Sequence, residues 1–168
     1  LLDKKNIIYN PNNKKILFIN RDAGIGDFLN NSLYLLFDIK DKNKDTIIHY
    51  TSNWDPRNLN LIEFFKDILE YKNPNDIDDK YDLIIDNTCK FTNTKYQVIF
   101  NNLVNNNKTV KIYYHKKIFE NNTISRRLMF IDLISDNFRE KIFEFMDKKI
   151  VKYKKKYIGV HLGGLSTN

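Results

Sequence analysis

The sequence predicts an α/β protein with a Rossmann-like, mostly parallel sheet and helices on both faces. Apolar runs of strand length alternate along its 168 residues with segments whose apolar residues recur at helical spacing. The first two expected strands begin about 30 residues apart, which is the length of one βαβ unit. The run at residues 81–86 is nearly continuously apolar, as is typical of a strand covered on both faces. Right-handed crossovers between such units make neighbouring strands parallel.

The individual elements are expected where the periodicity changes. Strands are predicted at residues 15–20, 46–51, 68–71, 81–86, 110–115 and 157–162, and helical spacing appears at 28–37, 59–69, 96–104, 124–134 and 138–146. Residues 1–14 are interpreted as an N-terminal arm or edge strand. The predicted organisation is one Rossmann-like domain over residues 1–146, a lysine-rich linker over 147–156, and the first strand and glycine turn of a second domain over 157–168.

Composition narrows the class of protein. The hydrophobic fraction of 42% and the aromatic fraction of 14% indicate a globular chain rather than a disordered one. No run approaches the roughly 20 apolar residues that span a bilayer. The single cysteine, Cys89, cannot form an internal disulfide, which suits a reducing cytoplasm. The three scattered histidines share no ligand spacing with this cysteine, so no metal site is expected.

A glycine turn follows the first strand and carries the chemistry. Gly24 and Gly26 let the backbone bend sharply and let another molecule approach it. In an open α/β sheet, ligands bind at this place, outside the carboxyl end of a strand. A dinucleotide fingerprint would need glycine where Leu29 stands, and a phosphate-binding P-loop would need a Gly-Lys-Ser/Thr sequence that the turn lacks. What remains is an acidic residue presented at the mouth of the sheet.

Two roles are open for that acid, Asp27. A carboxylate at a helix N-terminus accepts backbone N–H bonds and complements the helix dipole, which is a structural role. The same carboxylate is also suited to act as a general base, because it stands where a ligand would bind. Asp22, earlier on the same turn, competes for the second role. Arg21 beside them is suited either to a bidentate contact with an anionic ligand or to pairing with Asp22 or solvent.

Two motifs carry a resemblance to a known family. The run Arg21-Asp22-Ala23-Gly24-Ile25-Gly26-Asp27, followed by a hydrophobic helix, resembles the N-terminal signature of the ADP-heptose:lipopolysaccharide heptosyltransferases, glycosyltransferase family 9. The run Ile158-Gly159-Val160-His161-Leu162-Gly163-Gly164 is similar to the strand and glycine turn that open the donor-binding domain of that family. This chain has Leu162 where the family usually has proline.

The resemblance implies a GT-B fold, of which residues 1–146 would be the acceptor side. It also implies an inverting transfer of a sugar from an ADP-sugar to a lipopolysaccharide-core glycolipid or a related glycan, without metal or other cofactor, at the cytoplasmic side of the membrane. Asp27 would be the catalytic base. The acceptor-binding residues would be Arg21, Asp22, Gly24, Gly26, Arg126 and Arg127, and the donor-phosphate-binding residues His161, Gly163, Gly164 and Ser166. Since the donor domain would only begin here, the chain is expected to turn over poorly alone.

Two other functions stay open. A Rossmann-like domain of this kind can bind an anionic ligand or partner without catalysis. The formal net charge of +7 also favours contact with phosphates, lipid head groups or nucleic acid. RNA binding is the third hypothesis and nucleic acid is not the expected partner, because no ordered stacking motif accompanies the charge. The basic cluster within residues 148–156 is interpreted as a solvated linker face, with a patch for an anionic partner as the alternative.

Overall fold

The structure is a computed structural model that describes residues 2–21, 32–53, 65–78, 80–88, 95–113 and 123–125, together with Glu140, Lys141, Glu144, Asp147 and Lys148. Its helices are α1 (Leu2–Ile8), α3 (Leu33–Lys42), the 3-10 helix η3 (Pro74–Asp76) and α5 (Gln97–Asn106). Its strands are β1 (Lys15–Asn20), β2 (Ile47–Ser52), β3 (Glu70–Tyr71), β4 (Leu83–Thr88), β5 (Thr109–Tyr113) and β6 (Thr123–Ser125).

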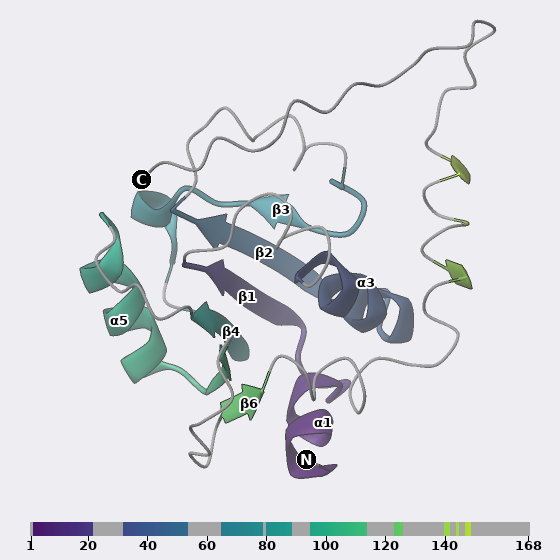
Figure 1. Ribbon diagram of the computed structural model, residues 1–168, viewed down its shortest axis with the longest axis horizontal. Coiled ribbons are helices and arrows are strands. Elements are labelled where there is room, and N and C mark those ends of the chain that lie inside the picture. Colours follow the sequence, from purple (N-terminus) through teal and green to yellow (C-terminus); the bar gives the residue numbers. More distant parts are fainter. Residues whose placement is uncertain are drawn as a thin grey trace, which may run out of the picture.

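The strands form one six-stranded sheet in the order β3-β2-β1-β4-β5-β6, and each neighbouring pair is parallel (Figure 1). The predicted α/β class with a Rossmann-like parallel sheet is therefore confirmed. From β1 the chain moves outward through β2 to β3, then returns to β4 on the other side of β1. This reversal makes the β1–β4 boundary a topological switch point, the kind of place where open α/β sheets bind ligands.

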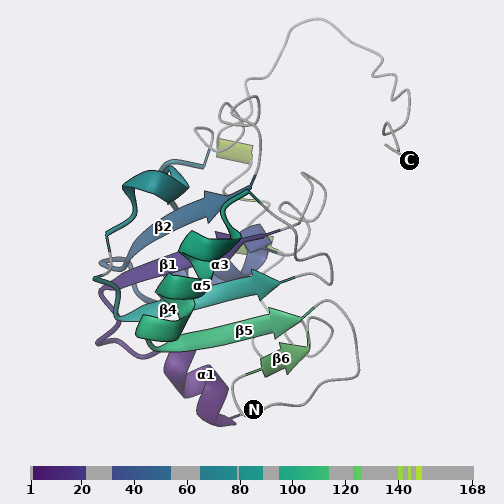
Figure 2. The same ribbon diagram turned by 90° about the vertical axis from the view of Figure 1, so that its left-hand side faces the viewer.

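Two apolar layers enclose the sheet. Alternate residues of β1 point to opposite faces, so Ile16 and Phe18 join one core cluster and Leu17 and Ile19 join the other. The first cluster lies under α1 and α3, and the second lies under α5. Figure 2 shows α5 in front of the sheet. Four consecutive fully buried side chains explain why the β1 sequence is continuously apolar.

Several predicted elements are confirmed with shifts of one or two residues at their ends. The strands expected at 15–20, 46–51, 68–71, 81–86 and 110–115 correspond to β1, β2, β3, β4 and β5, and the helix expected at 96–104 corresponds to α5. Within the predicted helix 138–146, the described residues Glu140, Lys141 and Glu144 are helical, as are Asp147 and Lys148, which fall in the predicted linker. The strand expected at 157–162 lies outside the described residues, so the predicted linker and second domain stay predictions.

The expectation for residues 1–14 was wrong in type. Residues Leu2–Ile8 form the helix α1 rather than an arm or edge strand. Ile8 is buried in the α3-side core, and the hydroxyl of Tyr9 donates to Asp38 on α3. The short apolar group of this segment is therefore the buried side of a helix turn.

Two further expectations were wrong in part. Ile124 opens an apolar run that was predicted to be helical, yet it lies in β6 and pairs with Ile112 of β5. The edge of β5 offers unpaired backbone groups, and a strand of three residues satisfies them. Residues 65–68, predicted to lie in a helix, form a hydrogen-bonded turn in which Ile68 N donates to Phe65 O.

Candidate functional site

Polar side chains gather at the carboxyl ends of the central strands, at the switch point. They close strands that are otherwise apolar, and all of them are buried: Asn20 on β1, Thr51 and Ser52 on β2, and Asp86 and Asn87 on β4. Buried polar groups cost folding free energy unless they are hydrogen-bonded. Each of these side chains therefore needs a hydrogen-bond partner.

On the α3 side of the sheet, the polar groups are linked in a chain. Asn87 Nδ2 donates to Asn20 Oδ1 at 3.0 Å, and Asn20 Nδ2 donates to the Tyr50 hydroxyl oxygen at 2.8 Å. Asn20 and Asn87 are direct neighbours in the β1–β4 register. Burial raises the pKa of Tyr50, so that its hydroxyl stays neutral. This chain joins β4, β1 and β2 across the switch point.

On the α5 side, Arg21 is held by a buried carboxylate. Its Nε and Nη2 atoms donate to the two carboxylate oxygens of Asp86, at 2.8 and 3.1 Å, in a bidentate pair. Its Nη1 donates to Asn101 Oδ1 of α5 at 2.8 Å, and the guanidinium carbon lies 5.6 Å from the centre of the Phe100 ring. The side chains of Arg21 and Asp86 are only 8% and 1% exposed. Burial raises the pKa of Asp86, and this effect outweighs the opposing influence of Arg21.

The backbone of Arg21 is held as well. Its N–H donates to Asn87 O at 3.2 Å, and its carbonyl oxygen accepts from Asn53 Nδ2. Arg21 is thus tied to β4, to α5 and to the residue that follows β2. These contacts fix the position of Arg21, which directly precedes the predicted glycine turn in the sequence.

Some buried polar groups at the carboxyl edge have no hydrogen-bond partner in the described ranges. Within the described part of the chain, three buried side-chain oxygens have no hydrogen-bond partner: Ser32 Oγ, Thr51 Oγ1 and Asn53 Oδ1. Thr51 and Asn53 lie at the end of β2. Ser32 precedes α3, which runs back toward the start of β2, so Ser32 is at the end of that helix nearer the carboxyl edge. All three unpaired atoms therefore belong to the same edge of the sheet.

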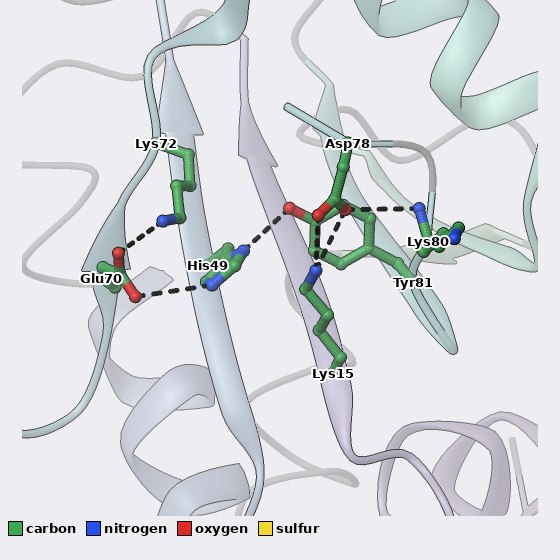
Figure 3. A network of polar contacts seen from close by, with 7 residues as sticks. All are labelled: Lys15, His49, Glu70, Lys72, Asp78, Lys80 and Tyr81. Carbon is green, nitrogen blue, oxygen red and sulfur yellow. Dashed lines mark hydrogen bonds and ion pairs between the residues drawn. The ribbon is translucent and has the colours of Figure 1, made fainter. Parts of the chain in front are cut away.

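The amino-terminal half of the sheet contrasts with this edge. His49 of β2 is 7% exposed and has partners on both ring nitrogens: its Nδ1 lies 2.8 Å from the Tyr81 hydroxyl, and its Nε2 lies 3.5 Å from Glu70 Oε2 (Figure 3). Glu70 also accepts from Lys72. The Tyr81 ring meets His49 edge-on at 5.6 Å between centroids. Burial raises the pKa of Tyr81, which disfavours any role for it as a nucleophilic phenolate.

The neighbouring polar groups of this half are paired too. Lys15 Nζ contacts both carboxylate oxygens of Asp78 at 2.8 and 3.0 Å and lies 4.8 Å from the centre of the Tyr81 ring. Asp82 accepts from the backbone N–H groups of Lys14 and Lys15, each at 2.9 Å. Thr46 Oγ1 donates to Asn13 O at 3.0 Å. We interpret the contacts of this half as structural, because they hold β3 and the residues that precede β4 against the sheet.

A cavity of about 450 Å³ lies away from both regions, between α1 and the end of α3. Lys5 and Lys42 line it together with Tyr9. Lys42 already contacts Asp38 at 2.7 Å and the face of the Tyr9 ring at 3.8 Å. Both lysines stand in the last turns of their helices, where a cation complements the helix dipole. Their placement is thus explained by the two helix ends.

Of the predicted site residues, the structure describes Arg21. The carboxylate that it holds is Asp86, which the sequence analysis did not single out, and its role as an acceptor ligand stays a prediction. The other candidates lie outside the described residues: Asp22, Gly24, Gly26, Asp27, Arg126, Arg127, His161, Gly163, Gly164 and Ser166. The residues that sequence reasoning missed are Asn20, Thr51, Asp86, Asn87 and Asn101. For Asp86 a signal existed, because a charged residue follows three apolar ones near the end of a predicted central strand.

Comparisons of this chain with protein-family models, with curated proteins and with solved structures gave no match. Among the residues that the structure describes, no three His, Cys, Asp or Glu side chains are grouped so that they could hold a metal ion. In the same described ranges, no helix has the length and apolar character needed to cross a membrane.

Proposed function

We propose that this chain is the acceptor-side domain of an inverting glycosyltransferase of the heptosyltransferase kind. The donor would be an ADP-sugar and the acceptor a lipopolysaccharide-core sugar or a related glycan, at the inner face of the cell membrane. Two observations support the proposal. The glycine turn resembles the signature of that family, and it follows a strand at the switch point of a parallel sheet.

The contacts of Arg21 are the observation that carries the proposal. Arg21 is held by Asp86, Asn101 and Asn87 at the carboxyl edge. The turn with Asp22 and Asp27 follows it directly in the sequence. A catalytic carboxylate must be positioned to within hydrogen-bond distance of its proton, about 3 Å. A turn that starts from an anchored residue has fewer conformations to lose when a ligand binds.

The proposed reaction is a single displacement. The acceptor hydroxyl oxygen attacks the anomeric carbon of the donor sugar while the Asp27 carboxylate takes the hydroxyl proton. The bond between the anomeric carbon and the diphosphate oxygen breaks, and the nucleoside diphosphate leaves with that electron pair from the opposite face. The configuration at the anomeric carbon inverts. His161, Gly163, Gly164 and Ser166 would hold the diphosphate through backbone N–H groups, as the glycine turn of the resembled donor domain does.

The test is a transfer assay on the natural full-length protein with ADP-heptose and a core glycolipid. We expect Asp27→Asn to lower the rate by about 10²- to 10⁴-fold, the usual contribution of a general base. Asp22→Asn is the comparison on the same turn: as an acceptor-binding residue it should weaken acceptor binding, and at saturating acceptor it should change the rate far less. An unchanged rate in Asp27→Asn would remove Asp27 as the base, and the reverse order of the two effects would assign the role to Asp22.

A second candidate is a Rossmann-like binding domain without catalysis. The unpaired buried oxygens at the end of β2 favour it, because they indicate a place for a ligand and require no base. Ligand binding without any transfer by the wild-type protein, and with Asp27→Asn binding equally well, would support this candidate over the enzyme.

A further inference from the structure

The cavity between the C-terminal ends of α1 and α3 has the size of a small-molecule site. Its volume of about 450 Å³ falls within the range of about 300–1,000 Å³ that such sites occupy. The residues that line it are Lys5, Asn6, Tyr9, Asn10, Pro11 and Lys42. Because α3 begins near the carboxyl edge and ends at this cavity, the cavity is separate from the candidate site and from the proposed reaction.

One wall of the cavity is held in place by a buried carboxylate. Asp38 of α3 is 1% exposed, accepts a hydrogen bond from the Tyr9 hydroxyl and contacts Lys42 Nζ at 2.7 Å. The same Nζ atom lies 3.8 Å from the centre of the Tyr9 ring, which adds a cation–π contact. These two contacts fix the Lys42 ammonium at the cavity wall. Burial and the hydrogen bond to Asp38 raise the pKa of Tyr9, so its hydroxyl stays neutral.

The segment that follows α1 forms the second wall and is held by its own asparagines. Asn13 Nδ2 donates to Ile7 O at 2.6 Å, and Asn13 N donates to Asn10 O at 2.9 Å. Asn10 Oδ1 accepts from Asn12 N at 2.9 Å, which leaves the two N–H groups of the Asn10 amide as donors. Walls that are fixed before a ligand arrives lose little conformational freedom on binding.

The polar groups of the lining favour an anion. The lining contains no carboxylate, and each of its two lysines has three N–H donors, of which Asp38 takes one from Lys42. Lys5 has no ion-pair partner among the described residues. The helix dipoles explain why lysines stand at these two ends, but they supply no counter-ion to Lys5. Lysine binds phosphate as a point charge, whereas bidentate carboxylate recognition favours arginine, which the lining lacks.

The rest of the lining is apolar. The Tyr9 ring and the Pro11 ring lie in the same cavity, which is larger than a phosphate ion requires. We propose that this cavity binds a soluble phosphate monoester with a flat apolar group. Lys5, Lys42 and the Asn10 amide hold its phosphate, and Tyr9 and Pro11 contact its flat group.

Isothermal titration calorimetry on the chain tests this binding, with phenyl phosphate as the probe. We expect saturable binding, with inorganic phosphate at least about tenfold weaker because it lacks the apolar ring. Phenol keeps the ring without the charge and should not compete. Absence of saturable phenyl phosphate binding, or equal competition by phenol, would overturn the proposal. Binding to vesicles that contain phosphatidic acid, without binding of phenyl phosphate, would overturn it in favour of a lipid head group.

Two lysine variants separate this cavity from general attraction to a basic protein. Lys5 is exposed, so Lys5→Gln removes its charge without disturbing the core and should weaken phenyl phosphate binding about tenfold. Lys44→Gln is the matched control, because Lys44 is exposed just beyond α3 and does not line the cavity. Its affinity should equal that of the wild type. Equal weakening in both variants would overturn the proposal.

Amide chemical shifts locate the bound probe. Phenyl phosphate should shift the signals of Asn6 and Asn10 and leave that of Arg21 at the carboxyl edge unchanged. A shift at Arg21 without shifts at Asn6 and Asn10 would overturn the proposal. Neither measurement involves glycosyl transfer, so failure of this site and failure of the proposed function are distinguishable.

Discussion

The two halves of the same sheet treat their buried polar groups differently. In the amino-terminal half, His49, Tyr81, Lys15 and Thr46 have partners within the chain. At the carboxyl edge, Arg21 and Asp86 form a buried pair, while Thr51, Asn53 and Ser32 each keep a buried oxygen without a partner in the described ranges. Both halves lie on the same strands, so strand formation does not explain the difference. We propose from this difference that the amino-terminal half serves stability and that the carboxyl edge is the place where a ligand would bind.

The largest effect should come from separating the buried pair at the carboxyl edge. Asp86→Leu leaves the Arg21 guanidinium buried without its carboxylate and should cost about 3–5 kcal/mol of unfolding free energy. Asp78→Ala breaks the ion pair between Lys15 and Asp78, in which the Asp78 side chain is 58% exposed. It should lower the unfolding free energy by less than about 1 kcal/mol. Urea unfolding measures both. Equal costs for the two variants would contradict the proposed difference between the halves.

The double variant Arg21→Met/Asp86→Leu sharpens the same comparison. The double variant removes both buried charges together, so that neither is left buried without its partner. We therefore expect the double variant to be more stable than Asp86→Leu and within about 2 kcal/mol of the wild type. Costs that simply add in the double variant would show that the two side chains do not act as a pair.

A smaller effect, with opposite signs in the two halves, should come from two threonines. Thr51→Val removes an unsatisfied buried oxygen and should raise the unfolding free energy by about 1 kcal/mol. Thr46→Val removes a bonded hydroxyl and should lower it by about 1 kcal/mol. Each change corresponds to a shift of about 2–4 °C in Tm for a chain of this size. Destabilisation by Thr51→Val equal to that by Thr46→Val would refute the claim that the Thr51 hydroxyl is unsatisfied.

The smallest effect should be a dependence of stability on pH that comes from the amino-terminal half. Burial lowers the pKa of His49, with Lys72 and Lys15 acting in the same direction and Glu70 and Asp78 opposing them. The unfolded chain binds a proton near the ordinary pKa of about 6.5, whereas folded His49 binds it at lower pH. The unfolding free energy should therefore fall as pH drops below about 6.5 and level off below the folded pKa.

Urea unfolding between pH 8 and pH 5 measures this dependence. The variant His49→Gln should flatten the part of the curve that His49 causes, while other titrating groups still contribute to both proteins. Curves of equal slope for wild type and His49→Gln would show that His49 is not held neutral by its surroundings.

Much of the fold could be predicted from sequence because its signals are local. Strand β1 (Lys15–Asn20) contains consecutive apolar residues, and the apolar residues of α5 recur at helical spacing. In both cases the local sequence alone indicates which residues are buried. The segment Leu2–Ile8 and the strand at Ile124 could not be assigned this way. Their type depends on contacts with the α3 face and with the edge of β5, which lie outside the two segments themselves.

The candidate site was less predictable for the same reason. Arg21 and Asp86 are 65 residues apart, and only the β1–β4 register brings them together. Nothing in the local sequence distinguishes Thr51 from Thr46, since both are threonines at the ends of a β-forming run. Which hydroxyl has a partner is decided by the neighbouring segments: Asn13 approaches Thr46, and no described group does the same for Thr51.

The carboxyl edge is the proposed ligand-binding edge of this sheet. Amide chemical-shift mapping during a titration of the ¹⁵N-labelled chain with the proposed acceptor glycan tests this proposal. We predict shifts at Arg21, Thr51 and Asn53 and unchanged signals at His49, Glu70 and Tyr81. Shifts confined to His49, Glu70 and Tyr81, with Arg21, Thr51 and Asn53 unchanged, would contradict binding at the carboxyl edge.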